Sequence, residues 1–338
     1  MSIPVTRRDL LQGLAAIGGG SLLATGAGSA LAQAGKPAWP AKPIRVVVPF
    51  NAGGATDIIA RTIGEVLAKR LGQPVVIDNR GGAAGILGTE AVAKAAPDGH
   101  TLMVSLSTSM LINQFLYTKL PYNPQKDIAL ISQIAAAPVT LVVHPSVPAN
   151  NMKELLAYVK AHKGKLSYGS WGVGSYAHLA GAYMSKTMDA DMNHAAYKGE
   201  APMIQELIGG QLQLCFSSAL NTKPFIESGR LKAIGVTGKE RMEILPKLPT
   251  IFEQGVTDDA YSIYGWVAMG APAGTPKEVV DQLYGHLREI IKDPKVLERI
   301  TGAGFIPMMN SPQAFRDNYQ RDMPIWKALV EQAGAKLD

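Results

Sequence analysis

A regular alternation of short apolar runs with amphipathic segments constrains this chain more than any other feature of its sequence. The amphipathic segments predict helices at about 56–70, 86–95, 151–163, 176–187, 201–209, 276–292 and 312–335. The apolar runs predict buried strands: IRVVVP from Ile44, PVVIDN from Pro74, TLMVS from Thr101, APVTLVVHP from Ala137, LSYGS from Leu166, LQLCFS from Leu212, LKAIGVT from Leu231 and YGWVAMGAP from Tyr264. Such an alternation predicts an α/β fold of parallel sheets with helices on both faces.

Start signals support three of these helices. Thr275 and Glu278 form a predicted capping box with Pro276 at the first helical position. Ser311 before a proline repeats this start, and Asn151 with Glu154 three residues later makes a weaker version.

Two long strands suggest where the chain passes between domains, because each is followed by proline-rich sequence: TLVVHPSVP and YGWVAMGAPAGTP. If both are crossovers, one lobe holds residues 36–138 and 260–338, and the other holds 139–259. Two helix-covered sheets joined by two crossover strands form a two-lobed, type II-like periplasmic binding protein, whose ligand lies in the cleft between the lobes.

The first 34 residues resemble an export signal. Arg7 and Arg8 precede a weakly apolar Gly/Ala-rich run, which ends in small residues suitable for cleavage near 32–34. The pattern is twin-arginine-like, and an ordinary Sec signal is the alternative. Both predict a periplasmic protein. The single cysteine, Cys215, lies in an apolar run and is interpreted as a small buried hydrophobe.

Two turns between a strand and a helix are almost free of side chains. Gly53 and Gly54 follow the first strand, and the sequence from Ser170 to Ser175 contains two further glycines. At such a position a backbone without Cβ atoms can bring N–H groups and the positive end of a helix dipole against an anion. The sequence therefore predicts one carboxylate-sized cradle in each lobe.

Beyond these features, the chain resembles the solute-binding receptors of tripartite tricarboxylate transporters, the Bug family, from about Trp39 to its C-terminus. The resemblance rests on several ordered segments: WPAKPIRVVVPFNAGGATDIIAR, VIDNRGGAAGILGTEAVAKAAPDGHTLM, LPYNPQKDIALI, YGSWGVGSYAHLAGAYM, AAYKGEAPMIQELIGGQLQLCF and SGRLKAIGVTGKERMEILPKLPTIFEQG. It implies a monomeric periplasmic receptor that captures a small mono- or dicarboxylate and delivers it to membrane permease subunits.

The resemblance also implies which residues contact the ligand. In the family the carboxylate is typically held by backbone amides, hydroxyls and waters. Contacts of the first lobe would come from Phe50, Asn51, Ala52, Gly53, Gly54, Ser105 and Ser107, and those of the second from Ser170, Gly174, Ser175, His178, Tyr197, Lys198 and Gly199.

Several of these residues have a structural alternative. Ser105 and Ser107 could cap the following helix, His178 could be a packing histidine, and Tyr197 and Lys198 could be solvated loop residues. Asp57 is interpreted chiefly as an organiser of the first turn, because a carboxylate repels an anion but is stabilised at a helix N-terminus. It is kept among the site residues because it could also accept a hydrogen bond from the ligand.

Two positions depart from the family pattern. Ser217 stands where the family commonly has an aspartate, at a strand end expected to face the cleft, and Gly81 stands where it commonly has a proline. Because the first departure lies at a strand end expected to face the cleft, Ser217 is also a candidate site residue.

Other functions have weaker support in the sequence. No G-x-S-x-G, H-E-x-x-H, P-loop or C-x-x-C pattern occurs, so no catalytic residue, metal ligand or cofactor is predicted. The basic residues are scattered, which does not indicate nucleic-acid binding. The alternatives that remain are a receptor that signals to a sensor kinase and an exported nucleotide-dependent oxidoreductase. The identity of neighbouring genes would show whether the partner is a permease or a sensor kinase. Absorbance above 300 nm would reveal the nucleotide cofactor of an oxidoreductase.

Overall fold

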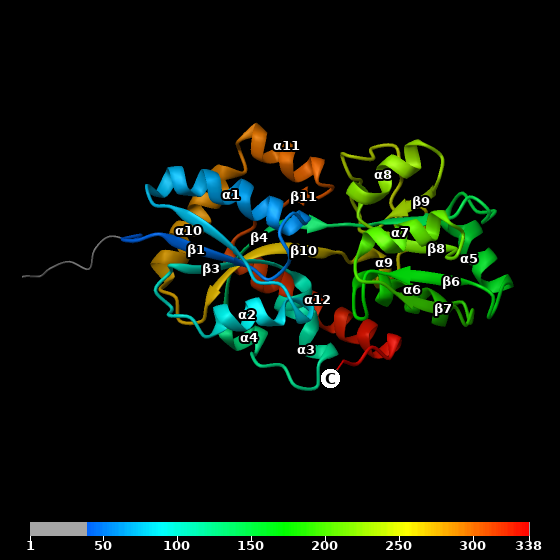
Figure 1. Cartoon of the computed structure of the whole chain (residues 1–338), viewed down its shortest axis with the longest axis horizontal. Coiled ribbons are helices and arrows are strands. Elements are labelled where there is room, and N and C mark those ends of the chain that lie inside the picture. Colours follow the sequence, from blue (N-terminus) through cyan, green and yellow to red (C-terminus); the bar gives the residue numbers. More distant parts are fainter. Residues whose placement is uncertain (1–38, 338) are drawn as a thin grey trace, which may run out of the picture. The chain divides into compact units, whose positions relative to one another are not determined.

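The computed structural model describes residues 39–337, which belong to one compact unit. The expected export signal at 1–34 lies outside the described residues. Figure 1 shows an α/β fold built on two sheets. The strands are β1 (Ile44–Val48), β2 (Val75–Asn79), β3 (Thr101–Leu106), β4 (Ile128–Ala137), β5 (Thr140–Val143), β6 (Ser167–Ser170), β7 (Asn193–Ala196), β8 (Leu214–Ser217), β9 (Lys232–Val236), β10 (Gly265–Pro272) and β11 (Ile306–Pro307).

Helices connect most of these strands. They are α1 (Ala55–Leu71), α2 (Ile86–Ala93), α3 (Asn113–Leu116), α4 (Pro124–Asp127), α5 (Met152–Ala161), α6 (Tyr176–Thr187), α7 (Glu200–Ile208), α8 (Ala219–Glu227), α9 (Asp259–Ser262), α10 (Lys277–Ile290), α11 (Pro294–Gly302) and α12 (Pro312–Ala333), with short helical turns η1 (Ala83–Gly85) and η2 (Thr108–Ile112). The seven predicted helices are all present, with ends shifted by at most two residues.

The first sheet has the strand order β11-β4-β10-β3-β1-β2, and the second has the order β7-β6-β8-β5-β9. Both sheets are mixed, so the expectation of parallel sheets was wrong. Strand β10 runs antiparallel to β3 and β4, and β5 runs antiparallel to β8 and β9. The reversal arises because the chain crosses from one sheet to the other after β4 and returns only through β10.

The lobe boundaries at 138/139 and 259/260 stay a prediction. The way the strands divide between the two sheets supports them. All strands of the first sheet lie within 44–137 or 265–307, and all strands of the second lie within 140–236. The first crossing is short, since only Pro138 and Val139 separate β4 from β5. The second is the longer segment 237–264.

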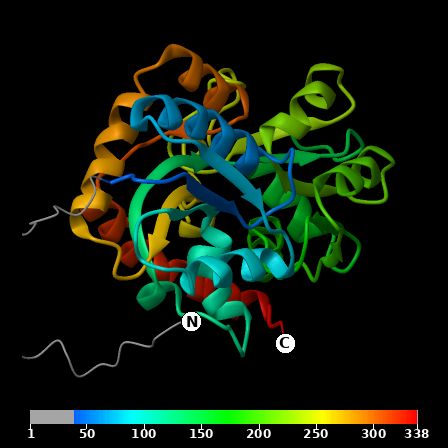
Figure 2. The same ribbon diagram turned by 60° about the vertical axis from the view of Figure 1, so that its left-hand side comes forward.

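Apolar side chains on alternate positions divide the first sheet into two faces. Ile44, Val46 and Val48 of β1 pack with residues of α1, α10 and α11 on one face. Figure 2 shows these three helices together beside the first sheet. Val47 of the same strand belongs to a second core on the opposite face. That core includes α12 and continues into α5, α6 and β8 of the second sheet. A single apolar core therefore links the two sheets through α12.

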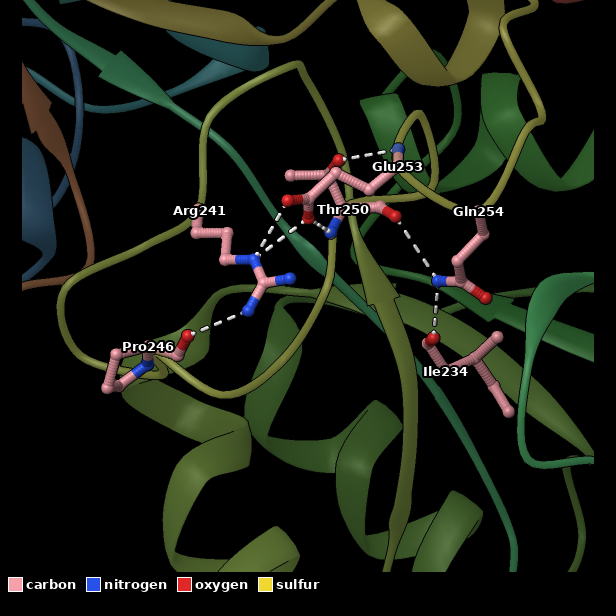
Figure 3. Close-up of polar contacts among 6 residues, drawn as sticks. All are labelled: Ile234, Arg241, Pro246, Thr250, Glu253 and Gln254. Carbon is pink, nitrogen blue, oxygen red and sulfur yellow. Dashed lines mark hydrogen bonds and ion pairs between the residues drawn. The ribbon is translucent and has the colours of Figure 1, made fainter.

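The connection between β9 and β10 has little regular structure and is held by polar contacts instead (Figure 3). Arg241 Nε donates to both carboxylate oxygens of Glu253 at 3.0 and 2.9 Å. Glu253 accepts from the Thr250 amide at 2.7 Å, and Gln254 Nε2 donates to the Ile234 carbonyl at 2.9 Å. The bonds of Glu253 hold the segment together, and the bond of Gln254 attaches it to β9.

Side-chain caps formed at two of the three predicted starts. Ser311 accepts from the Ala314 amide at 3.1 Å, and Asn151 accepts from the Glu154 amide at 2.9 Å. The capping box at Thr275 does not form, because its hydroxyl donates to the Pro272 carbonyl at 2.7 Å and Pro276 takes the N-cap position.

Candidate functional site

A cavity of about 380 Å³ lies where the two sheets meet, at the carboxyl ends of β1 and β3. Residues following strands of both sheets line it, together with the first crossing and the last helix. The lining consists of Phe50, Asn51, Gly53, Gly54, Ala55, Thr56, Asp57, Leu106, Ser107, Thr108, Ile112, Ala137, Pro138, Val139, Trp171, Tyr176, Glu200, Ser218, Leu220, Asn221, Gly265, Ala303, Gly304, Phe305 and Trp326.

The turn between β1 and α1 presents open hydrogen-bond donors to this cavity. Gly54 is the N-cap residue of α1 and supplies no side-chain cap. The first N–H groups of a helix have no intrahelical partner. Within residues 39–337, the amides of Gly54, Ala55 and Thr56 donate to no protein acceptor. Three donors and the positive end of a 17-residue helix therefore meet at the cavity wall.

Asp57 organises this turn, as the sequence predicted. Its side chain is 3% exposed. Oδ2 accepts from the Gly53 amide at 2.9 Å and from Arg61 Nε at 3.0 Å, and Oδ1 accepts from Asn79 Nδ2 at 3.0 Å. Burial acts to raise the pKa of Asp57, but the bonds from Arg61, Gly53 and Asn79 outweigh burial and hold that pKa below its usual value.

The open donors are therefore displaced by one residue from the predicted cradle. The Gly53 amide is already bound to Asp57, so the open donors begin at Gly54. Ala52 is exposed and lies outside the lining, whereas Phe50 and Asn51 belong to it. Gly81 leaves space for Asn51, whose Oδ1 lies 2.5 Å from where a Cβ at position 81 would be.

The turn between β6 and α6 differs from the expected second cradle, because nearby side chains accept hydrogen bonds from its amides. Ser175 caps α6 by accepting from the His178 amide at 3.4 Å. The Gly174 amide donates to His178 Nδ1 at 3.1 Å, and the Gly172 amide donates to Ser170 Oγ at 3.3 Å. Ser170, Gly174, Ser175 and His178 lie outside the lining of the cavity.

His178 packs inside the second half of the molecule. Its ring stacks on His194 with centroids 4.0 Å apart, and His194 Nε2 is 2.7 Å from Ser170 Oγ. Burial lowers the pKa of His178 to about 4, and the neighbouring His194 adds to this shift. Burial also lowers the pKa of His194. This geometry matches the packing alternative for His178.

The loop from Tyr197 to Gly199 reaches the cavity only through the residue that follows it. Neither Tyr197, Lys198 nor Gly199 is part of the lining. Glu200, the first residue of α7, is part of it and was missed by the sequence analysis. An acidic residue directly after a glycine at a predicted helix start was the available signal.

Glu200 is fixed by three neutral donors. Oε1 accepts from the Ser218 amide at 3.1 Å, and Oε2 accepts from Ser218 Oγ at 2.5 Å and from Asn221 Nδ2. Ser218 and Asn221 were also missed, and both line the cavity. The carboxylate thus comes from α7 and is held by the start of α8.

The remaining candidates are divided. Ser107 lines the cavity and is 3% exposed. Ser105 is fully buried in β3, with its Oγ 2.6 Å from Ser109 Oγ. Ser217 is also fully buried, and its hydroxyl has no partner in the described part of the chain. Neither Ser105 nor Ser217 contributes to the lining.

Five aromatic residues line the cavity, and of these the sequence predicted only Phe50. They come from segments far apart in the chain: Phe50, Trp171, Tyr176, Phe305 and Trp326. Tyr176 and Trp326 contact edge to face at 5.8 Å. No periodic pattern could have shown that these rings converge, because each lies at a different loop or helix.

The donors and walls suit an anion with an apolar body. Neither lysine nor arginine occurs among the lining residues. Within residues 39–337 no group of His, Cys, Asp and Glu is arranged to hold a metal ion, and no helix there is both long and apolar enough to span a bilayer.

Comparison with known proteins identifies the family. A family model described as "Tripartite tricarboxylate transporter family receptor" matches residues 59–335. Protein BugT of Bordetella pertussis is 33% identical over 300 residues, which cover 88% of this chain and 91% of BugT.

Solved structures agree. The periplasmic binding protein BugD is 36% identical with a TM-score of 0.73, over 88% of this chain and 99% of BugD. R. palustris Rpa4515, solved with adipate, is 31% identical with a TM-score of 0.77, over 88% of this chain and 98% of Rpa4515. This chain belongs to the tripartite tricarboxylate transporter receptor family.

Proposed function

We propose that this protein is a periplasmic receptor that captures a small organic acid in the cavity between its two sheets and delivers it to the permease of a tripartite tricarboxylate transporter. The observation that carries the proposal is the uncapped N-terminus of α1 at the cavity wall. The three open amides from Gly54 to Thr56 would hold the carboxylate of the ligand.

Several properties of the cavity support this. Its volume of about 380 Å³ is within the range of small-molecule sites. Backbone donors at a helix N-terminus bind an anion without a cationic side chain. The similar receptor Rpa4515 was solved with adipate, a small carboxylate, in a fold that this chain shares.

Capture would proceed by a shift between conformations. The lining includes residues from both halves of the molecule, so a ligand that contacts both gains the most binding energy when they are close together. Its differential affinity selects that arrangement. The permease would then recognise the selected arrangement.

The variant Ala55→Pro tests the proposed carboxylate cradle. It removes one open N–H at the first helical position of α1, where proline is well tolerated. Gly54 already has the extended conformation, φ −76° and ψ 166°, that a residue before proline prefers. A thermal-shift screen of mono- and dicarboxylates identifies a ligand, and calorimetry then measures its affinity. We expect Ala55→Pro to weaken binding by about tenfold or more with unchanged melting temperature.

Lys277→Pro is the matched control. Lys277 is the exposed first residue of α10 and lies outside the cavity. The control should bind as the wild type does. Unchanged affinity in Ala55→Pro would contradict the cradle, and absence of binding by every acid tested would contradict the proposed function itself.

A further inference from the structure

The cavity carries a carboxylate that the capture of a simple dicarboxylate does not explain. Glu200 lines the cavity on the side of the second sheet and accepts from Ser218 and Asn221. Within residues 39–337 its three donors are neutral and no ion pair balances its charge. An unbalanced carboxylate facing a ligand repels a second carboxylate there and attracts a hydrogen-bond donor.

The other acid in the lining is different. Asp57 lies at the α1 turn and is paired with Arg61 Nε at 3.0 Å. Its two oxygens are already engaged by Gly53, Arg61 and Asn79. These two parts of the cavity wall thus have opposite preferences. The α1 turn offers donors to an anion, and Glu200 offers an acceptor.

Glu200 also has unused acceptor capacity. A carboxylate has about four lone-pair sites. Three bonds are made within the described residues, two to Oε2 and one to Oε1. Because those bonds fix the side chain, Oε1 is a pre-oriented acceptor whose further bond requires little loss of side-chain entropy.

Aromatic rings also line the cavity. Phe50, Trp171, Tyr176, Phe305 and Trp326 contribute to the wall of a volume of about 380 Å³. Aromatic rings pack well against another ring, edge to face or offset. A volume at the lower end of the range for ligand sites suits one ring rather than a fused system.

We infer that the ligand is a monocarboxylate with a single aromatic ring and, remote from the acid, a hydrogen-bond donor that Glu200 accepts. The donor is a hydroxyl, amine or amide. Glu200 is then a specificity-determining residue, which excludes dicarboxylates. This inference rests on the proposed function, because it takes the α1 turn as the carboxylate site.

Four probes separate the contributions of ring and donor: 4-hydroxybenzoate, terephthalate, 6-hydroxyhexanoate and adipate. The first and third carry a donor, whereas the second and fourth carry a second carboxylate. Calorimetry should show 4-hydroxybenzoate binding at least about tenfold more tightly than terephthalate. It should show the same preference for 6-hydroxyhexanoate over adipate. The aromatic pair should also bind more tightly than the aliphatic pair.

The variant Glu200→Gln keeps the shape of the side chain and removes its charge. It should lower the preference for 4-hydroxybenzoate over terephthalate by about tenfold or more, chiefly by strengthening terephthalate binding. Glu206→Gln is the matched control, since Glu206 is exposed on the same helix and lies outside the cavity. Thermal unfolding of both variants checks that they fold.

The outcomes distinguish the two proposals. Tighter binding of terephthalate or adipate by the wild type, or an unchanged preference in Glu200→Gln, would overturn this inference and leave the organic-acid receptor intact. Tighter binding of the aliphatic pair would overturn the aromatic part. Failure of all four acids to bind, while the thermal-shift screen finds another acid that binds, would overturn this inference alone. Failure of every acid in the screen would overturn both proposals.

Discussion

The turns after β1 and β6 have similar sequences and opposite hydrogen-bond states. Both join a buried strand to a helix through small residues. After β6, Ser170, Ser175 and His178 bind the amides of the turn. After β1, the N-cap is a glycine without a side chain, and Asp57 takes only the Gly53 amide. A small-residue turn is therefore open to a ligand only where no nearby side chain occupies its donors.

The largest effect on stability is expected from Asp57→Ala, which removes the side chain that organises the turn between β1 and α1. It removes the acceptor of the Gly53 amide, of Arg61 Nε and of one Asn79 Nδ2 hydrogen bond, while Asn79 Nδ2 keeps its bond to the Phe50 carbonyl. Hydrogen bonds to a charged group contribute about 1.5–3 kcal/mol each, so loss of these bonds should lower the free energy of unfolding by about 2–4 kcal/mol. Urea denaturation measures this.

Asp78→Ala provides a control for loss of an ion-paired acid. Asp78, on β2, accepts from Arg45 and Arg80, and its side chain is 32% exposed. Asp78→Ala should lower the free energy of unfolding less than Asp57→Ala does, and it should leave ligand affinity unchanged. Equal losses in the two variants would show that Asp57 has no special part in forming the turn.

The second effect is a loss of stability on acidification, caused by His178 in the turn between β6 and α6. Burial holds the pKa of His178 at about 4, below the ordinary value of about 6.5. Below pH 6.5 the unfolded chain binds a proton that the folded chain does not, so stability is lost as pH falls from 6.5 toward 4. Between pH 7.5 and 5 we expect a loss of about 2 kcal/mol from this residue, measured by urea denaturation.

The variant His178→Gln should show a smaller loss over the same pH interval, because it removes the titrating group. Its remaining dependence would include His194, whose pKa burial also lowers. An identical pH dependence in variant and wild type would mean that His178 is not held neutral by the fold.

The smallest effect on stability is expected from Ser175→Ala. This variant tests whether the turn after β6 contacts the ligand. Loss of a serine N-cap costs about 1 kcal/mol of stability. Ser311→Ala is the control, because Ser311 caps α12 with the same backbone angles, φ −67° and ψ 158°. Both variants should lose similar stability and keep wild-type affinity. If Ser175→Ala alone weakened ligand binding, the second turn would contact the ligand, as the sequence predicted.

Much of the fold was predictable because local pattern and global packing agree. The helix at 176–187 was placed at its observed bounds, since an N-cap serine and an apolar stripe coincide. Strand β4 was missed because Ser132 and Gln133 interrupt its apolar run. Ser132 Oγ donates to the Asn310 carbonyl at 2.8 Å, and the Gln133 amide donates to Asn310 Oδ1 at 2.9 Å. A partner 177 residues away leaves no local signal.

The candidate site was less predictable for the same reason. The turn at 50–54 follows from sequence, because Gly53 and Gly54 stand between a clear strand and a clear helix. That Asp57 would use the Gly53 amide, and that Ser170 and His178 would occupy the donors of the other turn, depends on side-chain geometry. The position of Glu200 depends on α8, whose Ser218 and Asn221 hold it.

The place of Trp326 has a consequence for how the protein is made. The cavity needs Phe50 from the start of the fold and Trp326 from its last helix, so a chain emerging from the ribosome has no complete cavity until α12 has been synthesised. A solute present in the cell during translation cannot template the early part of the chain, and it can stabilise only molecules that are essentially full length.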